Sequence, residues 1–162
     1  MPQARCLILA CGNTLREDDG VGPFLAQWAE ERFAGEPRVR VVERHQWTPE
    51  LAQDLVEAQA VLFVDCATDS APGEVRIGPV EAAKTGRSEL GTHHLGAAEL
   101  LQLAKELYDA APRSSLLLTV GAGSLELREG FSEAVSNALP LACAQLEKAV
   151  VGMLADSPAY RA

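Results

Sequence analysis

The chain has 162 residues, of which 48% are hydrophobic and 23% are charged. This is the composition of a globular protein, and the length suits one domain with a sizeable core. Asp and Glu outnumber Lys and Arg by 23 to 14, and the resulting net charge of -9 disfavours any broad surface for nucleic acid or anionic membranes, because phosphate would be repelled.

Strand-like and helix-like segments alternate along the chain, which predicts an α/β fold with a largely parallel sheet. In chain order they are a buried strand at 6–10, a helix from 21 to about 33–35, a strand at 39–42, a helix that begins at 48–50, a strand at 61–64, an exposed or antiparallel strand at 73–80, a helix over 97–107, a buried strand at 115–120 and a helix from about 132 to 153. Pro140 either kinks this last helix or begins a new one. We expect a single domain over residues 1–155 and a flexible tail over 156–162.

Polar side chains suited to binding a metal occur in three segments of the chain. The first is the acidic loop 12–22 after the first strand, the second is Asp65 directly after the strand 61–64, and the third is the pair His93-His94 before a helix. An open α/β sheet would bring all three to the edge beyond the carboxyl ends of its strands. Two carboxylates and an imidazole make a partial shell for a divalent transition metal, with positions open to water or substrate.

Each of these segments also has a structural interpretation. Asp18 or Asp19 could cap the first helix, and Asp65 could accept hydrogen bonds from backbone N–H groups of its own loop. A phosphate cradle is a weaker alternative for the acidic loop, because it lacks GxGxxG and its carboxylates would repel phosphate.

His45 and Trp47 follow the strand 39–42 and belong to the same edge. Trp47 would form a hydrophobic wall for a peptide, or it would be a packed tryptophan in an ordinary turn. Cys66 follows Asp65, which suggests a thiol nucleophile, but the adjacent carboxylate would raise the thiol pKa instead of activating it. We expect the cysteines to be small buried residues.

The cysteines and the N-terminal residues also indicate in which compartment of the cell the protein is expected. Neither CxxC spacing nor a small-domain disulfide pattern is present, which favours reduced thiols in the cytoplasm. The first residues lead directly into a strand and no apolar run approaches the length of a membrane span, so we expect no signal peptide. The cysteines are Cys6, Cys11, Cys66 and Cys143.

Taken together, the three polar segments resemble the signatures of the nickel–iron hydrogenase maturation endopeptidases, in the same order. They are Gly12-Asn13-x-Leu15-x-x-Asp18-Asp19-Gly20-Val21-Gly22, the apolar strand that ends in Asp65, and His93-His94-Leu95-Gly96. The resemblance covers the chain up to its tail. It implies a twisted three-layer α/β/α sandwich with a central sheet of about five strands, and an endopeptidase that removes a C-terminal extension from the precursor of a hydrogenase large subunit.

The resemblance also implies roles for individual residues. The family's metal-contacting positions fall on Asp19, Asp65 and His93, which are therefore the candidate catalytic residues. Nickel is expected to arrive in the precursor, so that only a loaded precursor completes the acidic site. Near the scissile peptide nickel could polarise the carbonyl group or activate water, or one carboxylate could be the general base, as in an aspartyl protease. The candidate substrate contacts are Asp18, His45, Trp47 and His94.

The segment 45–51 departs from the Asp-Gly-Gly-Thr-like turn of many family members. It resembles the branch that serves cytoplasmic, NAD-reducing hydrogenases. A monomer is expected, since it leaves the site open to a large folded substrate. Two rival functions remain: a non-catalytic nickel carrier or sensing module with the same ligands, and a small nucleotide-binding domain, which the acidic loop disfavours.

Overall fold

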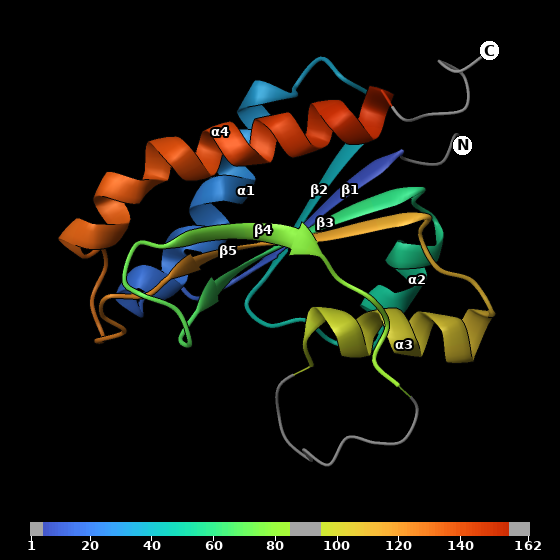
Figure 1. Ribbon diagram of the computed structural model, residues 1–162, viewed down its shortest axis with the longest axis horizontal. Helices are drawn as coiled ribbons and strands as arrows, with labels where there is room; N and C mark the ends of the chain where they lie inside the picture. Colours follow the sequence, from blue (N-terminus) through green and yellow to red (C-terminus); the bar gives the residue numbers. More distant parts are fainter. Residues whose placement is uncertain (1–4, 85–94, 156–162) are drawn as a thin grey trace.

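The computed structural model describes residues 5–84 and 95–155, in which strands and helices alternate along the chain (Figure 1). The strands are β1 (Cys6–Cys11), β2 (Val39–Arg44), β3 (Ala60–Ala67), β4 (Val75–Pro79) and β5 (Ser114–Gly121). The helices are the 3-10 helix η1 (Glu17–Gly20) and the α-helices α1 (Val21–Arg32), α2 (Leu51–Val56), α3 (Ala97–Tyr108) and α4 (Glu133–Ala155). The predicted alternation is therefore confirmed, while the predicted tail at 156–162 lies outside the described residues.

The strands form one sheet in the order β2-β1-β3-β5-β4. All neighbours pair in parallel except the edge strand β4, which runs antiparallel to β5. The chain begins in the middle of the sheet with β1, adds β2 on one side and then crosses over to place β3 on the other. This reversal makes a switch point between β1 and β3, and in open α/β sheets ligands bind beyond the carboxyl ends of the strands at such a point.

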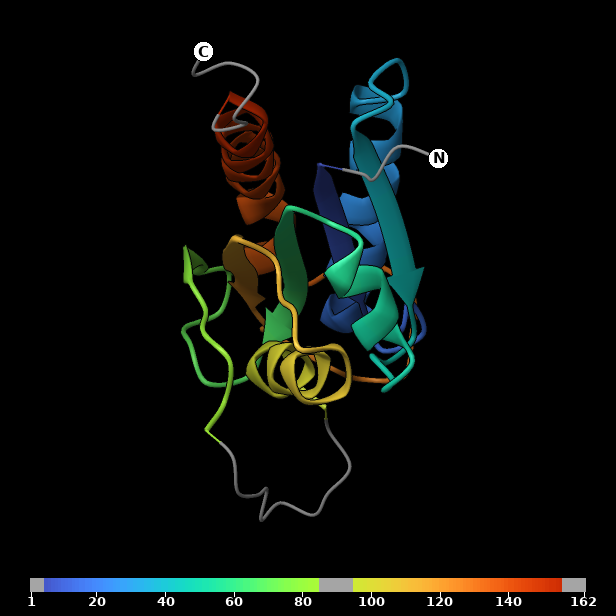
Figure 2. The ribbon, with the colours of Figure 1, turned by 90° about the vertical axis from the view of Figure 1, so that its right-hand side faces the viewer.

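Helices cover both faces of the sheet, with α1 and α4 on one face and α2 and α3 on the other (Figures 1 and 2). Alternate residues of β1 contribute to the two cores: Ile8 packs with residues of α1 and α4, whereas Leu7 and Leu9 pack with residues of α2 and α3. Each of these side chains is at most 1% exposed. Burial on both faces explains why the strand is continuously apolar. The predicted α/β/α sandwich with a mostly parallel five-stranded sheet is confirmed.

Several element boundaries differ from the prediction, and two of them, those of β3 and α2, concern the segments that carry candidate residues. β3 does not end at residue 64 but continues through Asp65, because β5 pairs with it along its whole length and Thr119 stands opposite Asp65. α2 begins at Leu51 without a side-chain cap, since Thr48 precedes the helix and its carbonyl group accepts the N–H of Leu51. Asp65 is therefore held by the sheet and not by a loop.

α4 runs unbroken through Pro140, so this residue does not begin a new helix. Pro140 has no N–H to donate to the carbonyl group of Ser136, four residues earlier in the helix. Because both residues are exposed, that carbonyl group is open to water instead. By length and composition alone α4 could cross a membrane. Its stripe with Leu146 and Val150, however, is buried against the sheet, as in a core helix.

Candidate functional site

A pocket of about 610 Å³ opens at the carboxyl edge of the sheet. Asp19, from η1 after β1, and Asp65, from β3, both line it, together with His45 and Trp47 from the segment after β2. The pocket thus lies at the switch point between β1 and β3, where the topology favours a ligand. The described part of the site therefore brings together two of the three predicted metal contacts and two of the predicted substrate contacts.

The third predicted metal contact, His93, and its neighbour His94 lie outside the described residues. Leu95 and Gly96, the next two residues in the sequence, do line the pocket. Within residues 5–84 and 95–155 no three His, Cys, Asp or Glu side chains lie close enough together to hold a metal ion. The two carboxylates are at most part of a metal shell, and any further ligand must come from elsewhere.

Asp65 stands near the carboxyl end of β3 and is half-buried. It follows Phe63 by two residues, so its side chain lies on the face covered by α2 and α3. Its Oδ1 atom accepts the backbone N–H of Cys66 at 2.7 Å and lies 3.3 Å from the Cys11 thiol, which donates to it. These bonds fix the orientation of a carboxylate that faces the pocket.

Asp19 is also half-buried and is fixed by the loop that precedes it. Its Oδ2 atom accepts the backbone N–H of Asn13 at 2.8 Å, and its own N–H donates to the carbonyl group of Arg16 at 3.0 Å. Neither bond caps α1, whose N-terminus has no side-chain cap. Asp19 is therefore directed into the pocket, and the capping interpretation of this residue is wrong.

Asp18 does not line the pocket, and its predicted contact with substrate is wrong. It is 0% exposed. Its carboxylate accepts the backbone N–H groups of Gly123, Ser124 and Ser132 at 2.7, 2.9 and 2.7 Å, and the Ser132 hydroxyl at 2.6 Å. Burial raises the pKa of Asp18, but these hydrogen bonds outweigh it and hold the pKa below its ordinary value. The residue ties the acidic loop to the segment before α4.

Glu17 strengthens the same connection, a role that the sequence did not suggest. Its side chain is 3% exposed, pairs with Arg128 at 3.1 Å and accepts the Ser124 hydroxyl. The hydrogen bond from Arg128 is the largest cause that lowers the pKa of Glu17. Backbone bonds run from Glu17 N–H to the Arg128 carbonyl group and from Asp18 N–H to the Ser124 carbonyl group. We call residues 17, 18, 124, 128 and 132 the loop network; it fixes the turn that carries Asp19.

Cys11 and Cys66 line the pocket but are not thiol nucleophiles. Burial, and then the charges of Asp19 and Asp65, raise the pKa of Cys66 to about 12. Burial, and then the charge of Asp65, also raise the pKa of the Cys11 thiol well above its ordinary value. Because a thiolate is the reactive form, both side chains stay protonated and unreactive near neutral pH.

Trp47 is a packed tryptophan that also borders the pocket, and its role as a wall for a peptide stays a prediction. Its side chain is 6% exposed and its ring meets that of Phe63 at a centroid distance of 5.3 Å, so it is a packed core residue. It also lines the pocket next to His45, which is exposed. Its buried Nε1 atom has no hydrogen-bond partner in the described part of the chain.

Two glycines allow α1 to begin directly against the end of β1. A Cβ atom on Gly22 would lie 2.1 Å from the carbonyl oxygen of Cys11, and one on Gly12 would lie 2.0 Å from that of Asp19.

We expect Gly22→Ala to lower the free energy of unfolding by about 3 kcal/mol or more, because backbone atoms must move apart. Denaturant titration measures this loss. Gly152→Ala in α4, where an added Cβ meets nothing within 4 Å, is the control and should be at least as stable as the wild type, because Ala favours a helix over Gly by up to about 1 kcal/mol. Equal stability of the two variants would contradict the tight approach.

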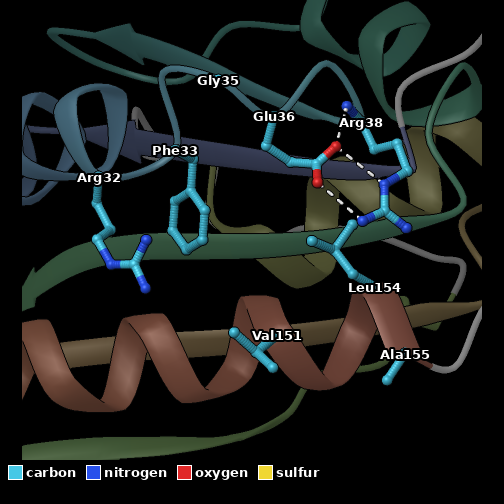
Figure 3. Close-up of a pocket in the computed structure, with 8 residues that line it drawn as sticks. All are labelled: Arg32, Phe33, Gly35, Glu36, Arg38, Val151, Leu154 and Ala155. Carbon is cyan, nitrogen blue, oxygen red and sulfur yellow. Dashed lines mark hydrogen bonds and ion pairs between the residues drawn. The ribbon is translucent and has the colours of Figure 1, made fainter.

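A second pocket, of about 570 Å³, lies at the opposite, amino edge of the sheet, between the segment after α1 and the end of α4 (Figure 3). Its polar feature is the ion pair of Glu36 and Arg38, and Val151 and Leu154 form its apolar wall. None of the predicted site residues that the structure describes lines this second pocket. The candidate site is the pocket at the carboxyl edge.

The chain matches the family model of hydrogenase maturation proteases, HycI, over residues 25–149. A comparison with curated proteins gave no match. The assignment of a family from the sequence therefore rests on the match to the family model.

Solved structures with the same fold include several maturation enzymes. The hydrogenase maturating endopeptidase HybD from E. coli is 22% identical with a TM-score of 0.72, over 91% of this chain and 93% of that chain. The nickel–iron hydrogenase maturation protease HybD from Thermococcus kodakarensis is 25% identical with a TM-score of 0.67, over 89% of this chain and 97% of that chain. A hydrogenase 2 maturation peptidase from a Thaumarchaeota archaeon is 23% identical with a TM-score of 0.65, over 90% and 97%.

Proposed function

The chain belongs to the hydrogenase maturation protease family, and on this premise we propose that it removes a C-terminal extension from the precursor of a hydrogenase large subunit. It is accordingly a peptidase. The observation that carries the proposal to the level of residues is the shared pocket of Asp19 and Asp65. Two fixed carboxylates at the open edge of a sheet provide both a binding site for a cation and a base for water.

We propose further that Asp19 and Asp65 bind nickel already inserted in the precursor, with His93 as the third contact. The histidine lies outside the described residues, so this part rests on the sequence motif and on Leu95 and Gly96, which line the pocket. Nickel is part of the substrate here. Two carboxylates in one pocket repel each other, and a loaded precursor supplies the cation that relieves this repulsion. An unloaded precursor offers no such gain and binds poorly.

Water is the nucleophile in this proposal, because the thiols of Cys11 and Cys66 stay protonated. Asp19 and Asp65 are the carboxylates of the pocket, and either can take the proton of water if nickel does not activate it. Location in the cytoplasm is part of the proposal, and the free state of all four cysteines supports it. Action as a monomer, and a precursor of the NAD-reducing type, stay predictions.

The test compares two precursors of a nickel–iron hydrogenase large subunit, one loaded with nickel and one without. Each is mixed with the purified protein, and its intact mass is followed. We expect the loaded precursor to lose a C-terminal peptide and the unloaded precursor to keep its mass. Equal cleavage of both would contradict recognition through nickel. An unchanged mass with transfer of nickel to the protein would favour the carrier.

A further inference from the structure

We propose that Arg16 binds the carbonyl oxygen of the scissile peptide and stabilises the negative charge that develops there. The inference rests on the proposed function, because it assigns a partner to the peptide that this site would cleave. Arg16 lines the same pocket as Asp19 and Asp65 and is the only Arg or Lys among the described residues that do so. The sequence motif leaves its position open, so the pattern of residues did not single it out.

The guanidinium of Arg16 is not engaged by the rest of the described chain. The side chain is exposed, and it makes no hydrogen bond or ion pair with any residue in 5–84 or 95–155. Arg16 lines the pocket together with Asp65 and Cys66 from the end of β3, which places its N–H donors on the same cavity as the two carboxylates. In agreement with this placement, its charge acts to lower the pKa of the Cys66 thiol against the larger effect of burial.

The backbone of Arg16, by contrast, is firmly held. Its N–H donates to the Asn13 carbonyl group at 3.0 Å, its carbonyl group accepts the N–H of Asp19 at 3.0 Å, and its backbone forms a β-bridge with Arg128 of the loop network. The Cα atom of Arg16 is thus fixed relative to Asp19, which lies three residues further along the same turn. A fixed backbone with a free head group is suited to an external acceptor.

The carboxylates and the guanidinium of the pocket carry opposite charges, so they suit different steps of the reaction. Attack of water on the carbonyl carbon moves an electron pair to the carbonyl oxygen, and breakage of the C–N bond then leaves a carboxylate and an amine that has gained a proton. Asp19 and Asp65 can bind a cation, or accept the proton that water loses and pass it to the leaving amine, but they would repel the negative oxygen. A guanidinium stabilises it, and Arg presents several N–H donors to an oxygen at once.

The absence of an ion pair between Arg16 and either carboxylate fits this division. An arginine that served only to neutralise Asp19 or Asp65 would lie within 4 Å of their oxygens, and none of the ion pairs among the described residues involves Arg16. The guanidinium and the carboxylates thus line one pocket of about 610 Å³ without pairing with each other. A peptide bond bound in this pocket could therefore meet both a cation and a base.

The test measures kcat and KM for the loaded precursor with Arg16→Leu, Arg16→Gln and Arg16→Lys. We expect Arg16→Leu and Arg16→Gln to lower kcat by about 100-fold with KM within about threefold, and Arg16→Lys to recover part of the rate, as when an oxyanion donor is lost. The thermal midpoint should not change, because the side chain has no partner to lose among residues 5–84 and 95–155. Arg44→Leu is the matched control: Arg44 is exposed at the end of β2, on the same edge, but does not line the pocket.

The outcomes separate this inference from the function on which it rests. If the wild-type protein leaves the loaded precursor intact, the proposed function fails and the role of Arg16 fails with it. If the wild type cleaves and Arg16→Leu cleaves at the same kcat, only the inference about Arg16 is overturned. A raised KM with an unchanged kcat would also overturn it, because Arg16 would then bind the substrate without favouring the transition state.

Discussion

Asp19→Asn is expected to lower the rate of precursor cleavage by about 1,000-fold or more while the fold is retained. The substitution removes a charge that the proposed reaction needs, either to bind nickel or to accept a proton. It costs the fold little, because the amide oxygen of asparagine can accept the Asn13 N–H that Asp19 Oδ2 accepts at 2.8 Å. Cleavage is measured by intact mass and stability by the thermal midpoint.

Asp69→Asn is the matched control for this variant. Asp69 is exposed in the loop after β3, at the same edge of the sheet, and does not line the pocket. The change of charge and shape is the same, so its rate should stay near that of the wild type. Cleavage by Asp19→Asn at the wild-type rate would remove Asp19 from the site, and an equal loss in both variants would indicate a general effect of charge on binding.

The order and type of the secondary structure could be predicted because burial sets hydrophobic patterns. β1 is apolar throughout since Leu7 faces one helical layer and Ile8 the other, and the amphipathic pattern of β4 reflects its place at the edge. The end of β3 could not be predicted in the same way. Hydrophobicity stops at Val64, but pairing with β5 carries the strand on to Ala67, and pairing with a distant strand leaves no mark in the local sequence.

The local pattern of residues does not distinguish Asp18 from Asp19; only the family resemblance places the metal contact on Asp19. The two acids are adjacent in η1, where successive residues point about 120° apart, so one can face the interior while the other faces the pocket. Which one turns inward depends on Gly123, Ser124 and Ser132, more than a hundred residues away. A local motif records that both acids are present but not which partners each will meet.

Removal of the Asp18 carboxylate should therefore destabilise the whole fold, and Asp18→Ala is expected to lower the free energy of unfolding by about 3–5 kcal/mol. The carboxylate accepts three backbone N–H groups and one hydroxyl group, all of which would lose their acceptor. Asp18→Asn keeps the shape but only one acceptor oxygen, so it should cost less. Ser132→Ala removes only the hydroxyl donor, at about 1 kcal/mol. Denaturant titration of the three variants gives the order, and a loss for Asp18→Ala no greater than that for Ser132→Ala would contradict the role of the network.

The pH dependence of this loss tests whether it is the ionised form of the Asp18 carboxylate that stabilises the fold. The pKa of Asp18 in the folded chain lies below its ordinary value of 3.8, so its stabilising effect is present at neutral pH and is lost as the pH falls through the folded pKa. The difference in free energy of unfolding between the wild type and Asp18→Asn should therefore be largest near pH 7 and shrink below pH of about 4. Glu17, whose pKa is also lowered, is present in both proteins, so it enters the difference only through its charge interaction with Asp18, which is a minor cause of its shift. A difference that stays constant down to acid pH would mean that the ionised carboxylate is not what holds the acidic loop, and with it Asp19, in place.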